Sequence, residues 1–213
     1  MTVAIRTVFL MCLALVGLNA QAGDDSTASK SLADTLREYR AFEADFIQIV
    51  VDAQGRRVQE VQGNLKAKRP GLFYWYAEPP MEQYIVARGR YVEVYDPDLE
   101  QVTIQAMDQQ MSSTPALLLS GEVDDLEESY RVSVQHHSGG VVDYTLEPRS
   151  PDSLFVTLRL RFRDQQLQEM RLQDSFEQIS ILSFRNVSIN GTIDDSAFEL
   201  AYPDGTDVIR SEG

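Results

Sequence analysis

The chain has 213 residues, with 33 acidic against 19 basic side chains and a formal net charge of −14. So negative a charge repels phosphate backbones and anionic headgroups, which argues against nucleic acid and against peripheral binding to a bilayer. The length suits one domain with its own core, and any charged partner is expected to present a basic face.

The N-terminal segment has the features of a secretory signal. Arg6 is its one charged side chain, residues 7–18 are apolar, and Ala20-Gln21-Ala22 fits the small-x-small cleavage rule. Cleavage is expected after Ala22, leaving 23–213 as a single exported domain, with an uncleaved anchor as the alternative. The lone Cys12 lies inside the leader, so the mature chain is expected to have no disulfide and no lipid anchor.

An amphipathic helix is predicted near residues 30–40, after a frayed lead-in. Its apolar stripe, at i, i+4 and i+7, consists of Leu32, Leu36 and Tyr39. Ser31 with Asp34 forms a weak capping pair, and Ser29 is the competing cap. We expect this apolar stripe to be buried by packing against another element of the fold.

An antiparallel hairpin follows. Its first strand, 42–51, starts with alternating apolar and acidic residues and becomes almost wholly apolar from Ile47, so its buried face could switch. A turn at 53–55 leads into a strand with one buried and one wet face. The buried face comprises Val61, Gly63, Leu65 and Ala67, and the wet face Glu60, Gln62, Asn64 and Lys66.

The stretch 68–76 organises the rest of the chain. Arg69-Pro70-Gly71 predicts a turn, because proline cannot donate to a ladder and glycine relieves crowding. The strand after it, 72–76, is apolar on both faces. It is either a central strand covered on both sides or a strand lining an apolar cavity.

The remaining pattern is that of an all-β protein with one helical interruption. Further strands are expected at 83–87, 91–95, 101–105, 130–134, 141–146, 154–163, 167–172, 179–184 and 198–202. In the strand 154–163 the predicted inner residues are Leu154, Val156, Leu158, Leu160 and Phe162. The outer row of Arg159, Arg161 and Arg163 is interpreted as a solvated face that balances acids. About eleven strands then form one curved antiparallel sheet, with helical pieces to cover its concave face.

The interruption spans residues 107–128. Thr114 can cap a short helix that starts at Pro115, and Ser120-Gly121 closes it. Its apolar core is the triplet Leu117, Leu118 and Leu119, which must be buried. The triplet either plugs the end of the sheet or belongs to a movable lid, and the acidic residues 122–128 form a short helix or loop.

No pattern for catalysis or metal binding is evident. His136 and His137 are adjacent, so on a strand they point to opposite faces and cannot chelate one ion together. The chain has no nucleophile elbow, phosphate loop or zinc spacing. We therefore expect no enzyme, no metal and no cofactor.

Six segments in this order resemble the periplasmic outer-membrane lipoprotein carrier (LolA) family over essentially the whole mature chain. They are Phe46-Ile47-Gln48, the stretch 59–63, Arg69-Pro70-Gly71-Leu72-Phe73 with Trp75, the stretch 95–103, Thr114-Pro115, and Pro203-Asp204-Gly205. The resemblance implies an unclosed β-barrel with an α-helical lid around an apolar cavity. It also implies a monomeric periplasmic carrier that takes lipoproteins from the inner-membrane LolCDE transporter to the outer-membrane receptor LolB.

The resemblance also implies roles for residues. Arg69 would hydrogen-bond to the lid and hold it closed, and Phe73 would lie near the cavity mouth. The expected acyl-chain cavity consists of Leu72, Phe73, Trp75, Val61, Leu65, Val92, Val94, Leu158 and Leu160. The expected lid residues are Leu32, Leu36, Tyr39, Leu117, Leu118 and Leu119. Tyr74 and Tyr76 depart from the family in being unusually aromatic.

Three rival interpretations remain at this point. A LolB-like receptor would share the fold but would need a lipid-modified cysteine at the start of the mature chain, and none is present there. A periplasmic binder of free fatty acids or other small apolar ligands fits the composition almost as well. A scaffolding β-domain would have no apolar cavity.

Overall fold

The computed structural model describes residues 25–106, 115–121, 123, 126–153 and 155–210. The predicted leader with Cys12, the capping residue Thr114 and the strand residue Leu154 lie outside the described residues. No helix in the described ranges is both long and apolar enough to cross a membrane.

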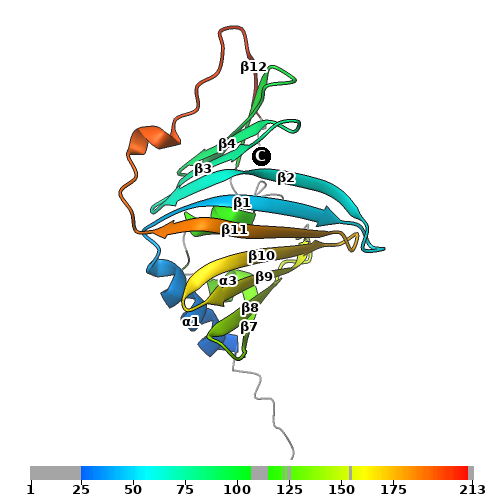
Figure 1. The fold of residues 1–213 in the computed structure, drawn as a ribbon, viewed down its shortest axis with the longest axis vertical. Coiled ribbons are helices and arrows are strands. Elements are labelled where there is room, and N and C mark those ends of the chain that lie inside the picture. Colours follow the sequence, from blue (N-terminus) through cyan, green and yellow to red (C-terminus); the bar gives the residue numbers. More distant parts are fainter. Residues whose placement is uncertain (1–24, 107–114, 122, 124–125, 154, 211–213) are drawn as a thin grey trace, which may run out of the picture.

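The described chain is dominated by one 12-stranded sheet, ordered β12-β6-β5-β4-β3-β2-β1-β11-β10-β9-β8-β7 (Figure 1). The strands are β1 (Ala41–Val51), β2 (Arg57–Lys68), β3 (Leu72–Ala77), β4 (Gln83–Arg88), β5 (Tyr91–Asp96), β6 (Gln101–Ala106), β7 (Tyr130–His136), β8 (Val141–Pro148), β9 (Phe155–Arg163), β10 (Gln166–Asp174), β11 (Ile179–Ile189) and β12 (Asp207–Arg210). Neighbouring strands are antiparallel, except that β12 runs parallel to β6. Because β12 and β7 are not paired with each other, the sheet is an unclosed barrel, as expected, with 12 strands rather than about eleven.

Helices lie on one face of this sheet. They are α1 (Asp25–Arg37), the 3-10 turn η1 (Pro115–Leu119) and the short α3 (Leu126–Ser129). Figure 1 views the sheet from the opposite side, so these helices lie partly behind the strands. Helix α1 contacts β7 and α3, and η1 contacts β2 and β10. The inner face of the sheet is therefore covered, and a fourth element, η2 (Asp195–Phe198), packs on β3 and β4 instead.

The predicted start of the first helix is wrong, because α1 already includes residues 25–30. Ser29 and Ser31 are interior residues rather than caps. Ser31 Oγ lies 2.8 Å from Tyr144 Oη, so it ties the helix to β8. The buried face of α1 begins at Ala28, one turn before the stripe that the periodicity indicated.

The predicted hairpin is confirmed, and its first strand does not switch faces. Phe42, Phe46 and Val50 are buried on the inner side of β1, while Ile47 and Ile49 stay half-buried on the outer side. In β2 the predicted inner residues are buried and the others are more exposed. The inner face of β2 is therefore buried from Val61 to Ala67, which fixes the register there.

The strand β9 departs from simple alternation at its start. Phe155 is buried and Val156 is 49% exposed, so the prediction of an inward Val156 is wrong. The pairing with β10 shifts between Gln173 and Asp174, and this bulge reverses which residues face inward. From Leu158 onward the predicted alternation holds.

The last predicted strand, 198–202, is also wrong. Phe198 ends η2 and is fully buried against Leu72 and Tyr74 on the outer face of β3. The strand that ends the sheet is β12, five residues beyond the predicted one. Because β3 is apolar on both faces, its outer face needs a cover, and the segment after β11 supplies it.

Candidate functional site

The inner face of the sheet carries the candidate site. Seven of the nine predicted cavity residues belong to one buried cluster: Val61, Leu65, Phe73, Trp75, Val92, Leu158 and Leu160. Val94 packs against this cluster and is partly buried. Leu72 is the exception, since it packs outward on Phe198, which corrects its predicted place in the cavity.

Strand register explains why residues far apart in the sequence meet here. Leu65 pairs with Trp75, Trp75 with Ile85, and Ile85 with Val94, so one apolar row crosses four strands. A second row runs from Ala67 through Phe73 to Val92. On the other wing, Leu160 pairs with Met170 and Tyr144. These rows form a continuous apolar surface on one face of the sheet.

An aromatic stack occupies the middle of this surface. The ring of Phe46 lies on the indole of Trp75, with centroids 3.7 Å apart and planes inclined by 24°. Gly63 is next to them, and a Cβ at this position would lie 2.8 Å from the Phe46 ring. The absence of a side chain at Gly63 therefore makes room for the stack.

The predicted lid residues rest on this surface. Leu32, Leu36, Tyr39, Leu117, Leu118 and Leu119 are at most 3% exposed and belong to the same cluster as the cavity residues. The two predicted sets are thus one buried unit in the structure, with the helices lying on the sheet.

Arg69 joins the sheet to both parts of the lid. Its Nε donates to the carbonyl of Tyr39, just beyond α1, at 3.2 Å. Its Nη2 donates to Leu118 O at 3.2 Å, and its Nη1 donates to Gly121 O. One guanidinium thus satisfies carbonyls at the ends of two helices. The amide of Gly71 adds a bond to Ser120 O at 2.8 Å.

Tyr39 makes a second link between the end of α1 and the sheet, which the sequence-based prediction missed because it treated Tyr39 only as part of the apolar stripe. Its hydroxyl donates to Gln165 O at 2.5 Å and accepts from the amide of Leu167 at 2.9 Å. Burial raises the pKa of Tyr39 to about 12. The phenol is therefore neutral at ordinary pH, and it ties the end of α1 to the turn between β9 and β10. Nothing in the sequence pattern marks this role, because the stripe shows only that the ring is buried.

His137 and the outward arginines of β9 lie away from the inner face, whereas His136 is an exposed end residue of β7 on the side of Val132. His137 Nε2 is 3.2 Å from Asp143 Oδ2, and Arg161 donates to both oxygens of Asp143 at 2.7 Å. These bonds from Arg161 hold the pKa of Asp143 below its usual range. Among the described residues, no group of three His, Cys, Asp or Glu side chains could hold a metal ion.

A groove lies at the rim of the apolar surface. It has a volume of about 310 Å³ and is lined by Glu60, Val61, Gln62, Glu78, Pro79, Pro80 and Met81. Among the described residues, Val61 is thus the one that lines this groove and also belongs to the buried cluster.

Comparison with known proteins identifies the family of this chain. The family described as "Outer membrane lipoprotein carrier protein LolA" matches residues 37–201. An outer-membrane lipoprotein carrier protein of Hahella chejuensis is 51% identical over 181 residues, which cover 84% of this chain and 87% of that protein. One from Pseudomonas aeruginosa is 42% identical over 206 residues, with 97% and 98% covered.

Solved structures agree on the fold. A LolA superfamily protein from Nitrosomonas europaea aligns with a TM-score of 0.51 at 11% identity, covering 81% of this chain and 98% of that one. An uncharacterized conserved protein from Thermus thermophilus aligns with a TM-score of 0.53 at 12% identity, covering 88% and 100%. The sequence relatives are named as carriers, a function without catalysis, so the chain is not an enzyme. By the extent of these sequence matches, the chain belongs to the outer-membrane lipoprotein carrier family.

Proposed function

We propose that this protein is a periplasmic chaperone for lipoproteins. It accepts outer-membrane-directed lipoproteins released from the inner membrane, shelters their acyl chains on its inner face and delivers them to an outer-membrane receptor. The proposed donor is a LolCDE transporter and the proposed receiver is LolB. The observation that carries the proposal is the apolar inner face under helices that one guanidinium, that of Arg69, joins to the sheet at two places.

Energetics explain why such a carrier needs a lid that competes with its cargo. Burial of acyl chain contributes about 0.8 kcal/mol per CH₂, so roughly 45 methylenes would contribute on the order of 35 kcal/mol. Non-covalent affinities saturate near about 20 kcal/mol, and a carrier must also release its cargo. When the lid opens, Leu32, Leu36 and Leu117 leave their contacts on the sheet. This loss offsets part of the gain and keeps release feasible.

The rim groove beside Val61 is the proposed way in for the chains. Met81, at its edge, is 50% exposed, which gives an acyl chain a first apolar contact outside the closed lid. Separation of the lid from the sheet would then extend the groove into the inner face.

A spheroplast assay tests the proposal. Purified protein is incubated with spheroplasts, and the supernatant is examined for outer-membrane lipoproteins in complex with it. Release of such complexes supports the carrier function. If no lipoprotein is released while native mass spectrometry shows bound fatty acid, the protein is a binder of small apolar ligands instead.

A further inference from the structure

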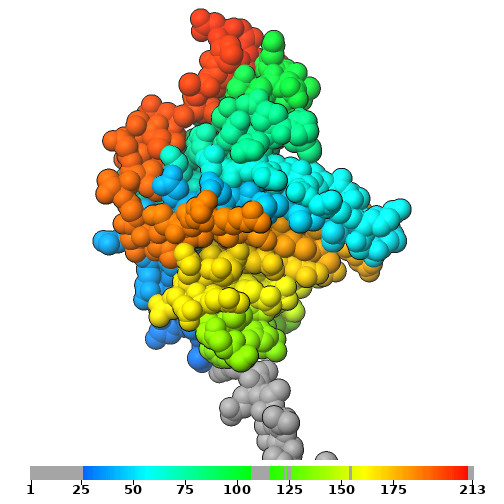
Figure 2. Space-filling view, viewed as in Figure 1, coloured from blue at the N-terminus to red at the C-terminus, as the bar shows by residue number. Residues whose placement is uncertain are grey.

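The outer face of the sheet carries an apolar strip that the lid and its cargo do not use. It runs over β1 and β11 and consists of the half-buried residues Ile47, Ile49, Ile179 and Ile181. An antiparallel sheet with one covered face normally shows polar residues on the other. The equivalent strip on β3 is covered by η2, whereas Figure 2 shows the near side of β11 and β10 open to solvent.

Arginines continue this strip across β10 and β9. Ile49 pairs with Ile181, Ile181 with Arg171, and Arg171 with Arg159, so the four side chains form one cross-strand row on the outer face. We call the surface of Ile47, Ile49, Ile179, Ile181, Arg159 and Arg171 the Ile-Arg face. It joins an isoleucine strip to a pair of cations.

One of the two cations of this face has no ion pair within the described chain. Arg171 and Arg159 are direct cross-strand neighbours, an arrangement of like charges that destabilises a sheet. Glu169 lies 3.6 Å from Arg159, while Arg171 has no ion pair among the described residues. The Nε of Arg159 is buried, and within the same residues it has no hydrogen-bond partner.

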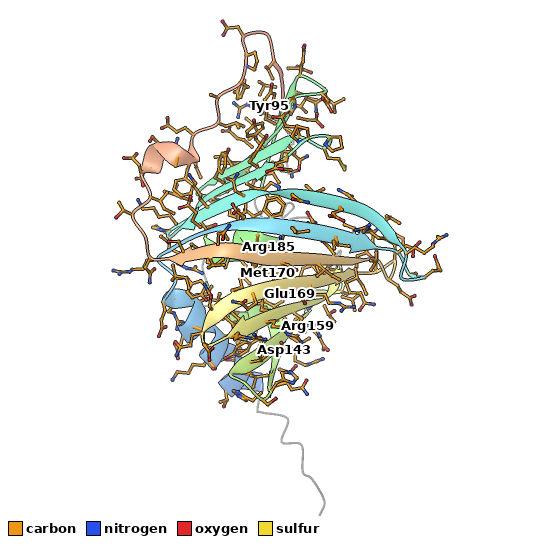
Figure 3. The ribbon with its side chains drawn as sticks, in the orientation of Figure 1. Tyr95, Asp143, Arg159, Glu169, Met170 and Arg185 are labelled. Atoms are coloured by element: carbon orange, nitrogen blue, oxygen red, sulfur yellow. The ribbon has the colours of Figure 1, made fainter. Side chains whose placement is uncertain are left out.

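Charges of both signs surround the pair, because Asp45 lies opposite Arg185 and Glu60 lies opposite Ile49. Arg161 is already held by Asp143, while Arg163 and Arg185 are exposed outward residues of β9 and β11. Figure 3 shows Arg185, Glu169, Arg159 and Asp143 one after another on β11, β10, β9 and β8. A chain with a net charge of −14 thus concentrates arginines on one open face.

We propose that the Ile-Arg face docks a partner protein whose surface presents carboxylates beside apolar side chains. A carboxylate between Arg159 and Arg171 would relieve their repulsion and accept forked hydrogen bonds. Protein interfaces typically combine an apolar core with arginine and are depleted in lysine. This partner chemistry is opposite to the basic face that the net charge alone suggested. The partner's place in lipoprotein transfer rests on the proposed function.

Charge and shape favour a protein over a bilayer as the occupant. The large net negative charge opposes approach to anionic headgroups. The isoleucines are half-buried between neighbouring strands, so they offer a flat contact surface rather than side chains that insert into lipid.

Two variants with matched controls test the docking face. Arg171→Glu reverses a charge in the row, and Arg90→Glu makes the same change at an exposed turn residue outside it. Ile181→Ser removes an apolar side chain from the face. Its control, Val58→Ser, removes one from β2 outside the face, where Val58 is 54% exposed. Lipoprotein release from spheroplasts and handover to outer-membrane vesicles are measured for each, together with uptake of a fluorescent fatty acid.

We expect Arg171→Glu and Ile181→Ser to slow release or handover about tenfold at low ionic strength, with fatty-acid uptake unchanged. Both control variants should match the wild type, and added salt should slow the wild type toward Arg171→Glu. Circular dichroism checks folding, and Arg171→Gln replaces Arg171→Glu if the latter unfolds.

Wild-type rates for both test variants would overturn the docking face. Co-sedimentation of the wild type, but not of Arg171→Glu, with phosphatidylglycerol vesicles would overturn it in favour of a membrane contact. A wild type that releases no lipoprotein would instead refute the proposed function.

Discussion

Phe46 stacks on Trp75 at a centroid distance of 3.7 Å, and the stack depends on the absence of a side chain at Gly63. A Cβ at Gly63 would meet Tyr76 O as well as the Phe46 ring, at 1.8 and 2.8 Å. The centre of the apolar inner face is thus built on one close approach between β2 and β3. Phe46, Gly63 and Trp75, from three neighbouring strands, form the centre of the surface on which the predicted lid residues pack.

Gly63→Ala should therefore lower the free energy of unfolding by about 1–3 kcal/mol, because the added methyl has to displace backbone or ring atoms. Gly121→Ala is the control, since its Cβ would make an ordinary contact of 3.6 Å with Leu117 O. Urea unfolding measures both. Equal midpoints for the two variants would show that the close approach carries no strain.

Phe73→Glu should reduce uptake of acylated cargo, because Phe73 is fully buried on the inner face and a carboxylate there opposes acyl chains. Tyr76→Glu is the control, because Tyr76 is half-buried on the outer face three positions along β3. A pull-down of lipoprotein from spheroplast supernatants measures uptake. The uncharged Phe73→Gln repeats the test if Phe73→Glu fails to fold, and wild-type uptake by both Phe73 variants would remove Phe73 from the site.

Much of this inner face followed from alternation along single strands. The inward residues of β2 were predicted in this way, because a period of two assigns faces wherever pairing is regular. Alternation could not assign the faces of β3, which is apolar on both, so Phe73 was expected from the family resemblance and Trp75 from its apolarity. The lid leucines were predicted to be buried because a short apolar helix cannot remain in water. Here local pattern and tertiary structure agree.

The errors within the sheet involve contacts with segments that are distant in the chain. Val156 points outward because a bulge opposite β10 adds a residue to the strand, and no local signal marks that bulge. Leu72 faces outward because it alternates with the inward Phe73, and Phe198, from a distant segment, covers it there. The carbonyls that Arg69 satisfies are likewise not encoded near Arg69, so only the family resemblance suggested its partners.

Arg69→Leu should favour the open lid, bind cargo more tightly and hand less of it on. Hydrogen bonds from a charged group contribute about 1.5–3 kcal/mol, so the ratio of open to closed protein should rise roughly 10- to 100-fold. The emission of Trp75, the only tryptophan, should shift to the red because its 5% exposure increases as the lid lifts. Arg90→Leu is the control. Handover to outer-membrane vesicles at the wild-type rate would refute the latch.

Asp143→Asn should remove a pH-dependent part of the stability. In the folded chain the bonds from Arg161 hold the pKa of Asp143 below its ordinary value of 3.8, whereas the unfolded chain keeps that value. As the pH falls, the unfolded chain is protonated first, so the stabilisation is complete above about pH 4 and is lost below it. Unfolding midpoints measured from pH 7 to pH 3 should show wild type and Asp143→Asn differing most at neutral pH and converging in acid.

Glu147→Gln, on the same strand but with an exposed carboxylate 3.3 Å from Arg131, should differ little from wild type throughout. Parallel curves for wild type and Asp143→Asn would mean that the charge of Asp143 does not stabilise the fold. Arg161 would then be as available to a partner's carboxylate as Arg159 and Arg171 are.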